Sequence, residues 1–156
     1  MDIRKASEND VDGIMNLLHQ VNDVHAAGRP DLFVHGHTKY DAENLKKIMT
    51  TPETPIFVGI DSFGVLAGYC FCIIEDHSTD NHLAPVKTLY IDDLCVNESY
   101  RGKHVGRTIF EAVVAYAKEN GFYNVTLNVW CCNPGAIKFY ESLGMKPMKI
   151  GMETIL

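Results

Sequence analysis

The most constraining feature of the sequence is the stretch 93–106, where an apolar strand leads into a basic, glycine-containing loop that opens a long amphipathic helix. The first turn of a helix has backbone N–H groups without partners and carries the positive end of the helix dipole. Gly102 and Gly106 have no Cβ, so an anion can approach the backbone closely. Three basic residues add positive charge: Arg101, Lys103 and Arg107. The stretch predicts an anion site, although a plain strand-turn-helix junction fits the loop alone.

A second stretch, 133–145, follows another apolar strand and predicts one short helix. Together the two stretches resemble the GNAT superfamily of N-acetyltransferases, whose pyrophosphate loop has the pattern Q/R-x-x-G-x-G/A and whose later helix has N-x-x-A-x-x-F-Y-x-x-x-G-F/M. Arg101 and Gly106 match the first pattern, and His104 stands where the family has its middle glycine. The second pattern is matched by Asn133, Ala136, Phe139, Tyr140, Gly144 and Met145. The resemblance covers residues 86–150 strongly and the N-terminal half only in the order of its elements.

Length and charge narrow the class of protein. A chain of 156 residues is expected to form one domain, 1–156, with a substantial core. It has no apolar run long enough for a membrane span and no secretory signal, which favours a cytoplasmic protein without a membrane partner. The net charge of −6 argues against a nucleic-acid partner and is compatible with a cationic substrate. Five cysteines without a C-x-x-C pair argue against a disulfide scaffold or a zinc ribbon.

Hydrophobic periodicity and turn residues predict the order of the elements. Strands are expected at 2–6, 56–60, 65–75, 86–96, 123–130, 146–150 and 152–155, and helices at 7–24, 41–50, 104–120 and 134–143. This order implies a mixed α/β fold with a parallel strand pair around the third helix. The resemblance implies a GNAT-like single domain: a central mixed, mostly antiparallel sheet with a splayed parallel strand pair and about four helices.

The resemblance implies an acyltransferase that moves an acetyl group from acetyl-coenzyme A to a primary amine by direct attack in a ternary complex. The backbone of the loop would hold the pyrophosphate, the exposed edge of the strand before it would align the thioester, and the later helix would hold the pantetheine arm. The implied cofactor-binding residues are Leu94, Cys95, Val96, Arg101, Gly102, Lys103, His104, Val105, Gly106, Arg107, Thr108, Asn133 and Tyr140.

Two catalytic roles follow from the same resemblance. Tyr140 matches the family's general acid, because a phenol with a pKa near 10 stays protonated at rest and can give its proton to a departing thiolate. Asp92 occupies the position of the base in polyamine acetyltransferases, with Asp93 as the alternative and ordered water as a third choice. Successive strand residues face opposite ways, so regular geometry is expected to send only one of the two acids into the cleft.

Several alternatives remain open from the sequence. His35 and His37 have no acidic or thiol partner at a matching spacing, so no metal is expected. Cys131 and Cys132 could supply a nucleophile for a covalent route, but direct attack needs none. A non-catalytic acyl-coenzyme A binding module is the rival function, and an acetyltransferase acting on charged tRNA conflicts with the acidic charge. The acceptor, a small-molecule amine or a protein N-terminus, is left open, and so is a homodimer.

Overall fold

A five-stranded sheet forms the centre of the protein. The structure is a computed structural model that covers residues 1–156. The strands follow one another in space as they do in sequence, and all pairs are antiparallel except β4 with β5. The strands are β1 (Asp2–Lys5), β2 (Ile56–Ile60), β3 (Leu66–Asp76), β4 (Lys87–Val96) and β5 (Asn124–Leu127). The helices are α1 (Val11–Gly28), α2 (Ala42–Thr50), α3 (Val105–Glu119) and α4 (Pro134–Ser142). The predicted mixed α/β fold with one parallel strand pair is confirmed.

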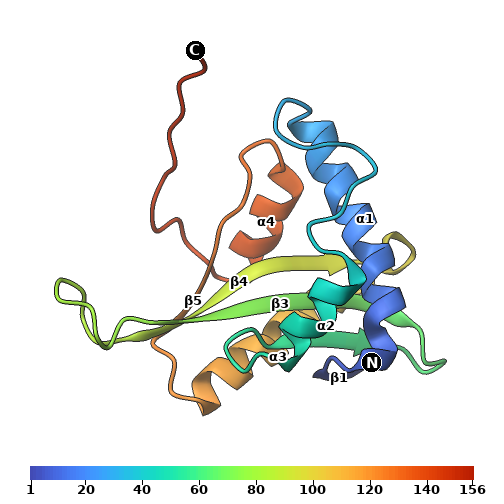
Figure 1. Cartoon of the computed structure of the whole chain (residues 1–156), viewed down its shortest axis with the longest axis horizontal. Coiled ribbons are helices and arrows are strands. Elements are labelled where there is room, and N and C mark those ends of the chain that lie inside the picture. Colours follow the sequence, from blue (N-terminus) through green and yellow to red (C-terminus); the bar gives the residue numbers. More distant parts are fainter.

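The helices cover both faces of the sheet (Figure 1). Helices α1 and α2 pack on one face over a buried cluster that includes Ile14, Leu45 and Tyr69. Helix α3 packs on the other face, where Ile109 and Val113 meet Leu89 and Ile91 of β4 and their neighbours. The two faces of β4 are therefore distinct, because alternate residues of the strand contribute to the cluster beneath α1 and α2 and to the cluster beneath α3. None of the helices has the length and apolar content needed to cross a bilayer.

Ser7 and Asp10 form a capping box at the N-terminal entry to α1, and the helix is longer than predicted. The Asp10 carboxylate accepts hydrogen bonds from the Ser7 backbone N–H and hydroxyl, at 2.7 and 2.9 Å, and pairs with Arg4. Helix α1 then runs to Gly28 instead of 24. Its last turn is retained because Ala26 is buried and the His25 ring packs on Phe33, with the ring centroids 5.0 Å apart.

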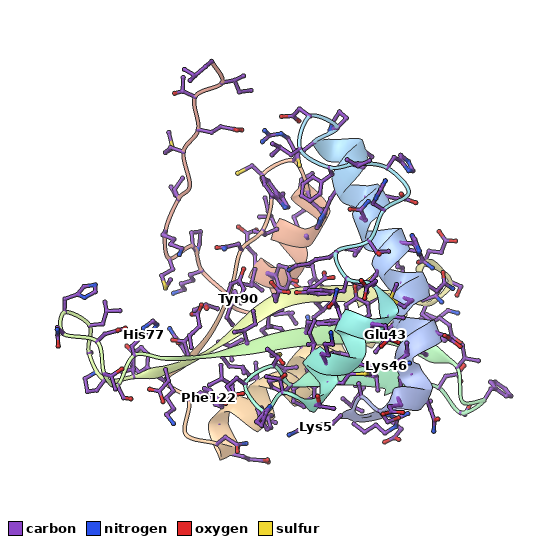
Figure 2. All side chains as sticks on the ribbon, viewed as in Figure 1. Lys5, Glu43, Lys46, His77, Tyr90 and Phe122 are labelled. Carbon is purple, nitrogen blue, oxygen red and sulfur yellow. The ribbon has the colours of Figure 1, made fainter.

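The parallel pair β4–β5 is splayed. Pairing joins Thr88–Ile91 of β4 only to Asn124–Leu127 of β5, whereas β4 itself continues to Val96. Strand β5 was predicted to reach residue 130, and this prediction is wrong. The chain diverges from β4 after Leu127, so residues 128–130 have no backbone partner on β4. Asn128 still donates a side-chain hydrogen bond to the hydroxyl of Tyr90 at 3.2 Å (Figure 2 labels Tyr90).

The antiparallel pair β3–β4 contains a bulge. Phe71 lies opposite Asp93, and the next residue, Cys72, lies opposite Ile91. Asp92 is therefore an extra residue of β4 without a partner on β3. A bulge of this kind bends the strand and changes the direction in which the extra side chain points.

The strands predicted at 146–150 and 152–155 are wrong for this structure. The chain after Met145 has no regular secondary structure, every residue of 146–156 is exposed, and none of them forms a backbone hydrogen bond. The physical reason is the absence of a neighbouring backbone, because an alternating sequence becomes a strand only when its N–H and C=O groups are paired. The segment stands apart from the sheet in Figure 1.

Candidate functional site

The loop before α3 presents unpaired backbone donors. Gly102 and His104 both have left-handed backbone angles, with φ of 73° and 62°, which turns the chain into the helix. The first helical residue is Val105, one residue later than predicted. The backbone N–H groups without a partner in the protein are those of Gly102, His104, Val105, Gly106 and Arg107. Unpaired N–H groups at the positive end of a helix dipole suit an anion such as a phosphate.

His104 is the only residue other than glycine with a positive φ. A left-handed conformation costs a non-glycine residue about 1 kcal/mol, which explains why the related pattern has glycine here. The imidazole is exposed and forms no hydrogen bond. The departure from the pattern is therefore accommodated in the backbone, and the neighbouring N–H groups stay free.

Gly106 is needed for close packing at the same point. A Cβ at this residue would lie 3.2 Å from the Phe139 ring and 3.2 Å from Val96 Cγ2. The absent side chain lets the start of α3 approach both β4 and α4. The two predicted stretches thus meet at Gly106, the loop on one side and the ring of Phe139 on the other.

The predicted basic side chains and Thr108 lie around the start of α3, and the hydrogen bonds that Arg101 and Arg107 form there are long. The Arg101 Nε donates to the Val96 carbonyl at 3.4 Å, and Arg107 donates to the Ser142 carbonyl at 3.4 Å. Lys103 is exposed, with its Nζ 5.3 Å from the centre of the Tyr100 ring. The Thr108 hydroxyl donates to the His104 carbonyl at 3.1 Å. Long polar contacts of this kind leave the cationic groups able to turn toward an anion.

The end of β4 offers a free backbone edge, because β5 has already diverged. Leu94, Cys95 and Val96 form this edge, opposite the side that pairs with β3. The Cys95 thiol is buried and donates to the Leu17 carbonyl at 3.6 Å, and burial raises its pKa to about 12. A thiol held protonated in this way is not a nucleophile. The edge can instead pair with an extended ligand as an added strand would.

Asp92 already binds an ammonium group, that of the protein's own Lys39. The Lys39 Nζ lies 2.7 and 2.6 Å from the two carboxylate oxygens, and the Tyr40 hydroxyl donates to the same carboxylate at 3.2 Å. The Asp92 side chain is 13% exposed, and that of Lys39 is 50% exposed. Burial lowers the pKa of Lys39, but its hydrogen bonds to Asp92 and the charge of that carboxylate outweigh the effect and raise the pKa above its usual value.

Asp93 lies in a different environment. The Tyr69 hydroxyl, on a fully buried side chain, donates to its carboxylate at 2.6 Å. Burial raises the pKa of Asp93 to about 6, while the Tyr69 hydrogen bond and the nearby charge of Lys39 act in the opposite direction. A carboxyl with this pKa is ionised at neutral pH and close to the range that suits a general base.

The prediction that only one of the two acids faces the cleft is wrong. Asp93 contacts Tyr69 of the cluster beneath α1 and α2, and Asp92 contacts the connection between those two helices. Both carboxylates therefore lie on the α1–α2 side of the sheet. The cause is the bulge, since the extra residue interrupts the alternation on which the prediction depended.

Helix α4 contributes Asn133 and Tyr140. The Asn133 Oδ1 accepts a hydrogen bond from the Ala136 N–H at 3.0 Å, so this side chain caps the helix. Tyr140 packs against Phe110 and the α3 cluster. Its hydroxyl forms no hydrogen bond within the protein, and because no buried polar side-chain atom lacks a partner, this hydroxyl is accessible to solvent. Burial is the main cause that raises the pKa of Tyr140, with smaller contributions from Cys70 and Asp93. The phenol is therefore protonated at neutral pH and free to donate.

Three polar residues of this site were missed by sequence reasoning: Lys39, Tyr40 and Tyr69. Lys39 and Tyr40 come from a loop, where no periodicity indicates a contact with a strand far along the chain. Tyr69 lies in the predicted strand 65–75, but the sequence analysis did not predict which residues of strand 86–96 lie opposite that strand. The register that places its hydroxyl on Asp93 depends on the bulge.

The connection between α1 and α2 also reaches the segment after β5. The Phe33 ring meets Trp130 edge to face, with centroids 5.5 Å apart, and the Arg29 guanidinium lies 5.8 Å from the centre of the Trp130 ring. Cys131 and Cys132, in the next turn, are exposed free thiols. The connection thus covers the side of the sheet where Asp92 and Asp93 lie.

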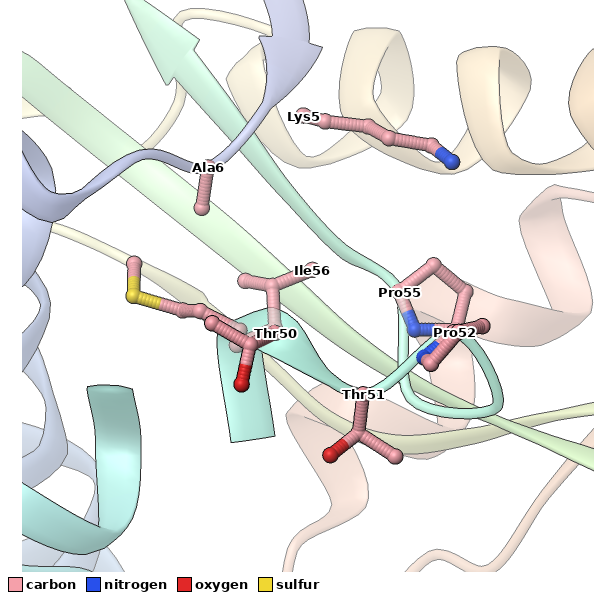
Figure 3. A pocket seen from close by; sticks show the side chains of 8 residues that line it. Lys5, Ala6, Thr50, Thr51, Pro52, Pro55 and Ile56 are labelled. Carbon is pink, nitrogen blue, oxygen red and sulfur yellow. The ribbon is translucent and has the colours of Figure 1, made fainter. Parts of the chain in front are cut away.

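A separate pocket of about 120 Å³ lies between the end of β1 and the turn after α2 (Figure 3). Its lining consists of Lys5, Ala6, Met49, Thr50, Thr51, Pro52, Pro55 and Ile56. None of these belongs to the predicted site, and Lys5 is the only ionisable side chain among them. The candidate site is therefore the region around the α3 loop, the end of β4 and α4.

Comparison with known proteins agrees with this arrangement. A protein of Bacillus halodurans, whose structure was solved as a point mutant, has 31% identity and a TM-score of 0.94 over 100% of this chain and 99% of that chain. A probable glucosamine 6-phosphate N-acetyltransferase of Drosophila melanogaster is 44% identical over 54 residues, which are 35% of this chain and 23% of that relative. An uncharacterised N-acetyltransferase of Methanocaldococcus jannaschii is 25% identical over 148 residues, which are 95% of this chain and 62% of the relative.

The chain spans less than two thirds of the length of either of these two curated relatives. The model of the family described as "Acetyltransferase (GNAT) family" matches residues 19–145. This match includes the α3 loop, both acids of β4 and the whole of α4. The chain belongs to the GNAT family of acetyltransferases.

Proposed function

We propose that this protein transfers an acetyl group from acetyl-coenzyme A to a primary amine that is bound as its ammonium ion on Asp92. The observation that carries the proposal is the position of Lys39, whose Nζ lies 2.6 Å from one Asp92 oxygen and 2.7 Å from the other. A carboxylate that binds the ammonium of the protein's own lysine can bind that of a substrate by the same contacts. Lys39 must leave before an acceptor binds there.

Acetyl-coenzyme A supplies the acetyl group as a thioester. The free N–H groups of Gly102 and of residues 104–107 would bind its pyrophosphate, with Arg101 and Lys103 able to turn inward. The open edge of β4 at Leu94, Cys95 and Val96 would align the extended arm and offer an N–H to the thioester oxygen. Asn133 keeps its Nδ2 free for the same arm, since only its Oδ1 is used by the helix.

Proton movements are assigned to two side chains. Asp92 takes the proton that the ammonium must lose before its nitrogen can attack, because this carboxylate holds the ammonium directly. Tyr140 gives its hydroxyl proton to the departing sulfur, because burial keeps the phenol protonated and its hydroxyl forms no hydrogen bond within the protein. Asp93 is the alternative base, and its pKa of about 6 suits the role, but the Tyr69 hydroxyl already occupies one of its oxygens.

A nitrogen acceptor is also supported by the relatives, both of which are named N-acetyltransferases. The acidic net charge and the ammonium site favour a cationic acceptor without an attached phosphate. Polyamines, amino-acid derivatives and protein N-termini have this character. An amino sugar phosphate, named for one relative, differs from them by its anionic group.

The test is thiol release from acetyl-coenzyme A with a panel of amines: a diamine, a triamine, an amino-acid amide, an N-terminal peptide and glucosamine 6-phosphate. We expect saturable release with at least one cationic amine and an acetylated nitrogen in the product. Binding of coenzyme A without release for any amine would indicate the rival function, a non-catalytic binding module. Selective release with glucosamine 6-phosphate would contradict the assignment of the ammonium site as the main determinant of the acceptor.

A further inference from the structure

Tyr40 forms a second surface against the ammonium group that Asp92 binds. The Lys39 Nζ lies over the Tyr40 ring, 5.4 Å from its centre, while the same nitrogen lies 2.7 and 2.6 Å from the two Asp92 carboxylate oxygens. The Tyr40 hydroxyl also donates to Asp92 Oδ2, at 3.2 Å. An aromatic face attracts a cation that lies within about 6 Å of the ring centre. The cation therefore contacts a carboxylate and an aromatic face that are themselves joined by a hydrogen bond.

This combination of groups occurs once in the chain. Three other aromatic rings lie near a cation: Tyr116 near Lys5, Trp130 near Arg29 and Tyr100 near Lys103. The Tyr100 hydroxyl likewise donates to a carboxylate, that of Asp61, but Lys103 forms no ion pair with Asp61. Only at Tyr40 does one carboxylate bind both the cation and the hydroxyl of the ring beside it.

The Tyr40 ring is fixed by packing and by its backbone. It stacks on Phe71, with the ring centroids 5.7 Å apart and the planes inclined by 18°, and Phe71 is 2% exposed. The Thr38 hydroxyl donates to the Tyr40 carbonyl at 2.8 Å, and the next residue, Asp41, is the N-cap of α2. The Lys39 side chain, by contrast, is 50% exposed. The ring and the Asp92 carboxylate therefore form a site that remains when Lys39 turns away into solvent.

The Tyr40 hydroxyl orients the Asp92 carboxylate toward the cation. Burial, together with the charge of Asp92, raises the pKa of Tyr40, so the phenol stays protonated at neutral pH and continues to donate. Only Oδ2 accepts this hydrogen bond, and both carboxylate oxygens still contact the Lys39 ammonium. The ring and the hydroxyl thus act on the same cation in different ways, which substitutions can separate.

We propose that Tyr40 is an acceptor-binding residue: an acceptor that replaces Lys39 places its ammonium group both on Asp92 and over the Tyr40 ring. The inference rests on the proposed function, because it concerns the same ammonium site, and it narrows the class of acceptor. The contact with the ring needs no N–H group, so an ammonium group whose nitrogen carries methyl groups also binds. The site therefore selects aliphatic ammonium ions, including N-methylated ones, over neutral molecules of the same shape.

The test measures cation binding in the absence of any transfer reaction. The probes are n-propylammonium, which resembles the end of a lysine side chain, and n-propyltrimethylammonium. They are titrated into the full-length Lys39→Met variant, in which Asp92 has no internal partner, and dissociation constants are taken from NMR shifts of the β4 backbone amides. We expect both probes to bind, and Tyr40→Leu in the same background to weaken both about 5-fold. Tyr40→Phe keeps the ring and should retain the affinity for the trimethylated probe.

The electron density of the ring separates a cation contact from simple packing. Tyr40→4-fluorophenylalanine and Tyr40→3,4,5-trifluorophenylalanine keep the ring shape of Tyr40→Phe but weaken the negative face of the ring. The affinity for the trimethylated probe should therefore fall stepwise across these three variants. The matched control is Tyr100→Leu in the Lys39→Met background, because Tyr100 also lies near a lysine and donates to a carboxylate. It should bind both probes unchanged.

The role of Tyr40 is overturned if neither probe binds to Lys39→Met, or if the three rings bind the trimethylated probe equally. The fluorinated series decides the matter even where Tyr40→Leu fails to fold. An unchanged KM for the amine in Tyr40→Leu, with thiol still released from acetyl-coenzyme A, would also overturn it while leaving the transfer reaction in place. Binding of the probes without thiol release for any amine would support the ammonium site and refute the transfer reaction, so the two failures are distinguishable.

Discussion

Replacement of Asp93 by asparagine should stabilise the protein at neutral pH. Partial burial raises the pKa of Asp93 from an ordinary value near 3.8 to about 6. Two pKa units correspond to about 3 kcal/mol, and solvent screening of a partly buried group reduces the cost of ionising Asp93 in the folded state to about 2 kcal/mol. The folded state binds this proton more tightly than the unfolded state does. Its contribution to stability is therefore present below about pH 4 and is lost as the pH rises through 6.

The Asp93→Asn variant lacks this titration but keeps an oxygen for the Tyr69 hydroxyl. Urea unfolding of the unmodified chain and the variant, at pH values from 5 to 7.5, measures the difference directly. The variant should gain about 1 kcal/mol relative to the unmodified chain over that range, and other titrating groups cancel in the comparison. Tyr69→Phe is the matched control, because it removes a donor that lowers the pKa of Asp93 and should make the loss of stability with pH steeper. A difference that does not change with pH would refute the reasoning.

Three further predictions concern catalysis. Tyr140→Phe removes only the hydroxyl, so kcat should fall about 10²-fold or more with little change in affinity for coenzyme A; unchanged kcat with rate-limiting chemistry would remove Tyr140 from the mechanism. Asp92→Asn should lower kcat/KM more than Asp93→Asn does, with relief at high pH where free amine is abundant; the opposite order in the pH–rate profiles would make Asp93 the base. Lys39→Met should lower KM for a cationic amine about 3- to 10-fold, because Asp92 loses its internal partner, whereas the exposed Lys46→Met should change nothing; a raised KM would show that Lys39 assists the acceptor.

The parts of the fold that depend on local chemistry were predictable from the sequence. The loop at Gly102 and Gly106, the helix that begins at Pro134 and the hairpin of β2 and β3 each follow from residues that are close in the chain. The splayed strand pair was predicted from the family resemblance.

The remaining features depend on contacts between distant segments. The bulge at Asp92 arises from the register of β4 against β3, which alternation along one strand does not reveal. Lys39 reaches Asp92 from a loop 53 positions away, where no pattern marks a partner. Residues 146–156 have the alternation of a strand, but a strand also requires a neighbouring backbone, and none lies beside them in the single chain.

The most direct test of the account is a matrix of initial rates of thiol release, with acetyl-coenzyme A and the best cationic amine both varied. Direct transfer within a ternary complex predicts reciprocal plots that intersect, and no release of thiol when the amine is omitted. Parallel plots, or one equivalent of thiol released without amine, would indicate an acetylated protein side chain such as that of Cys131 or Cys132. No release under any condition would contradict the assignment of this chain as an active N-acetyltransferase.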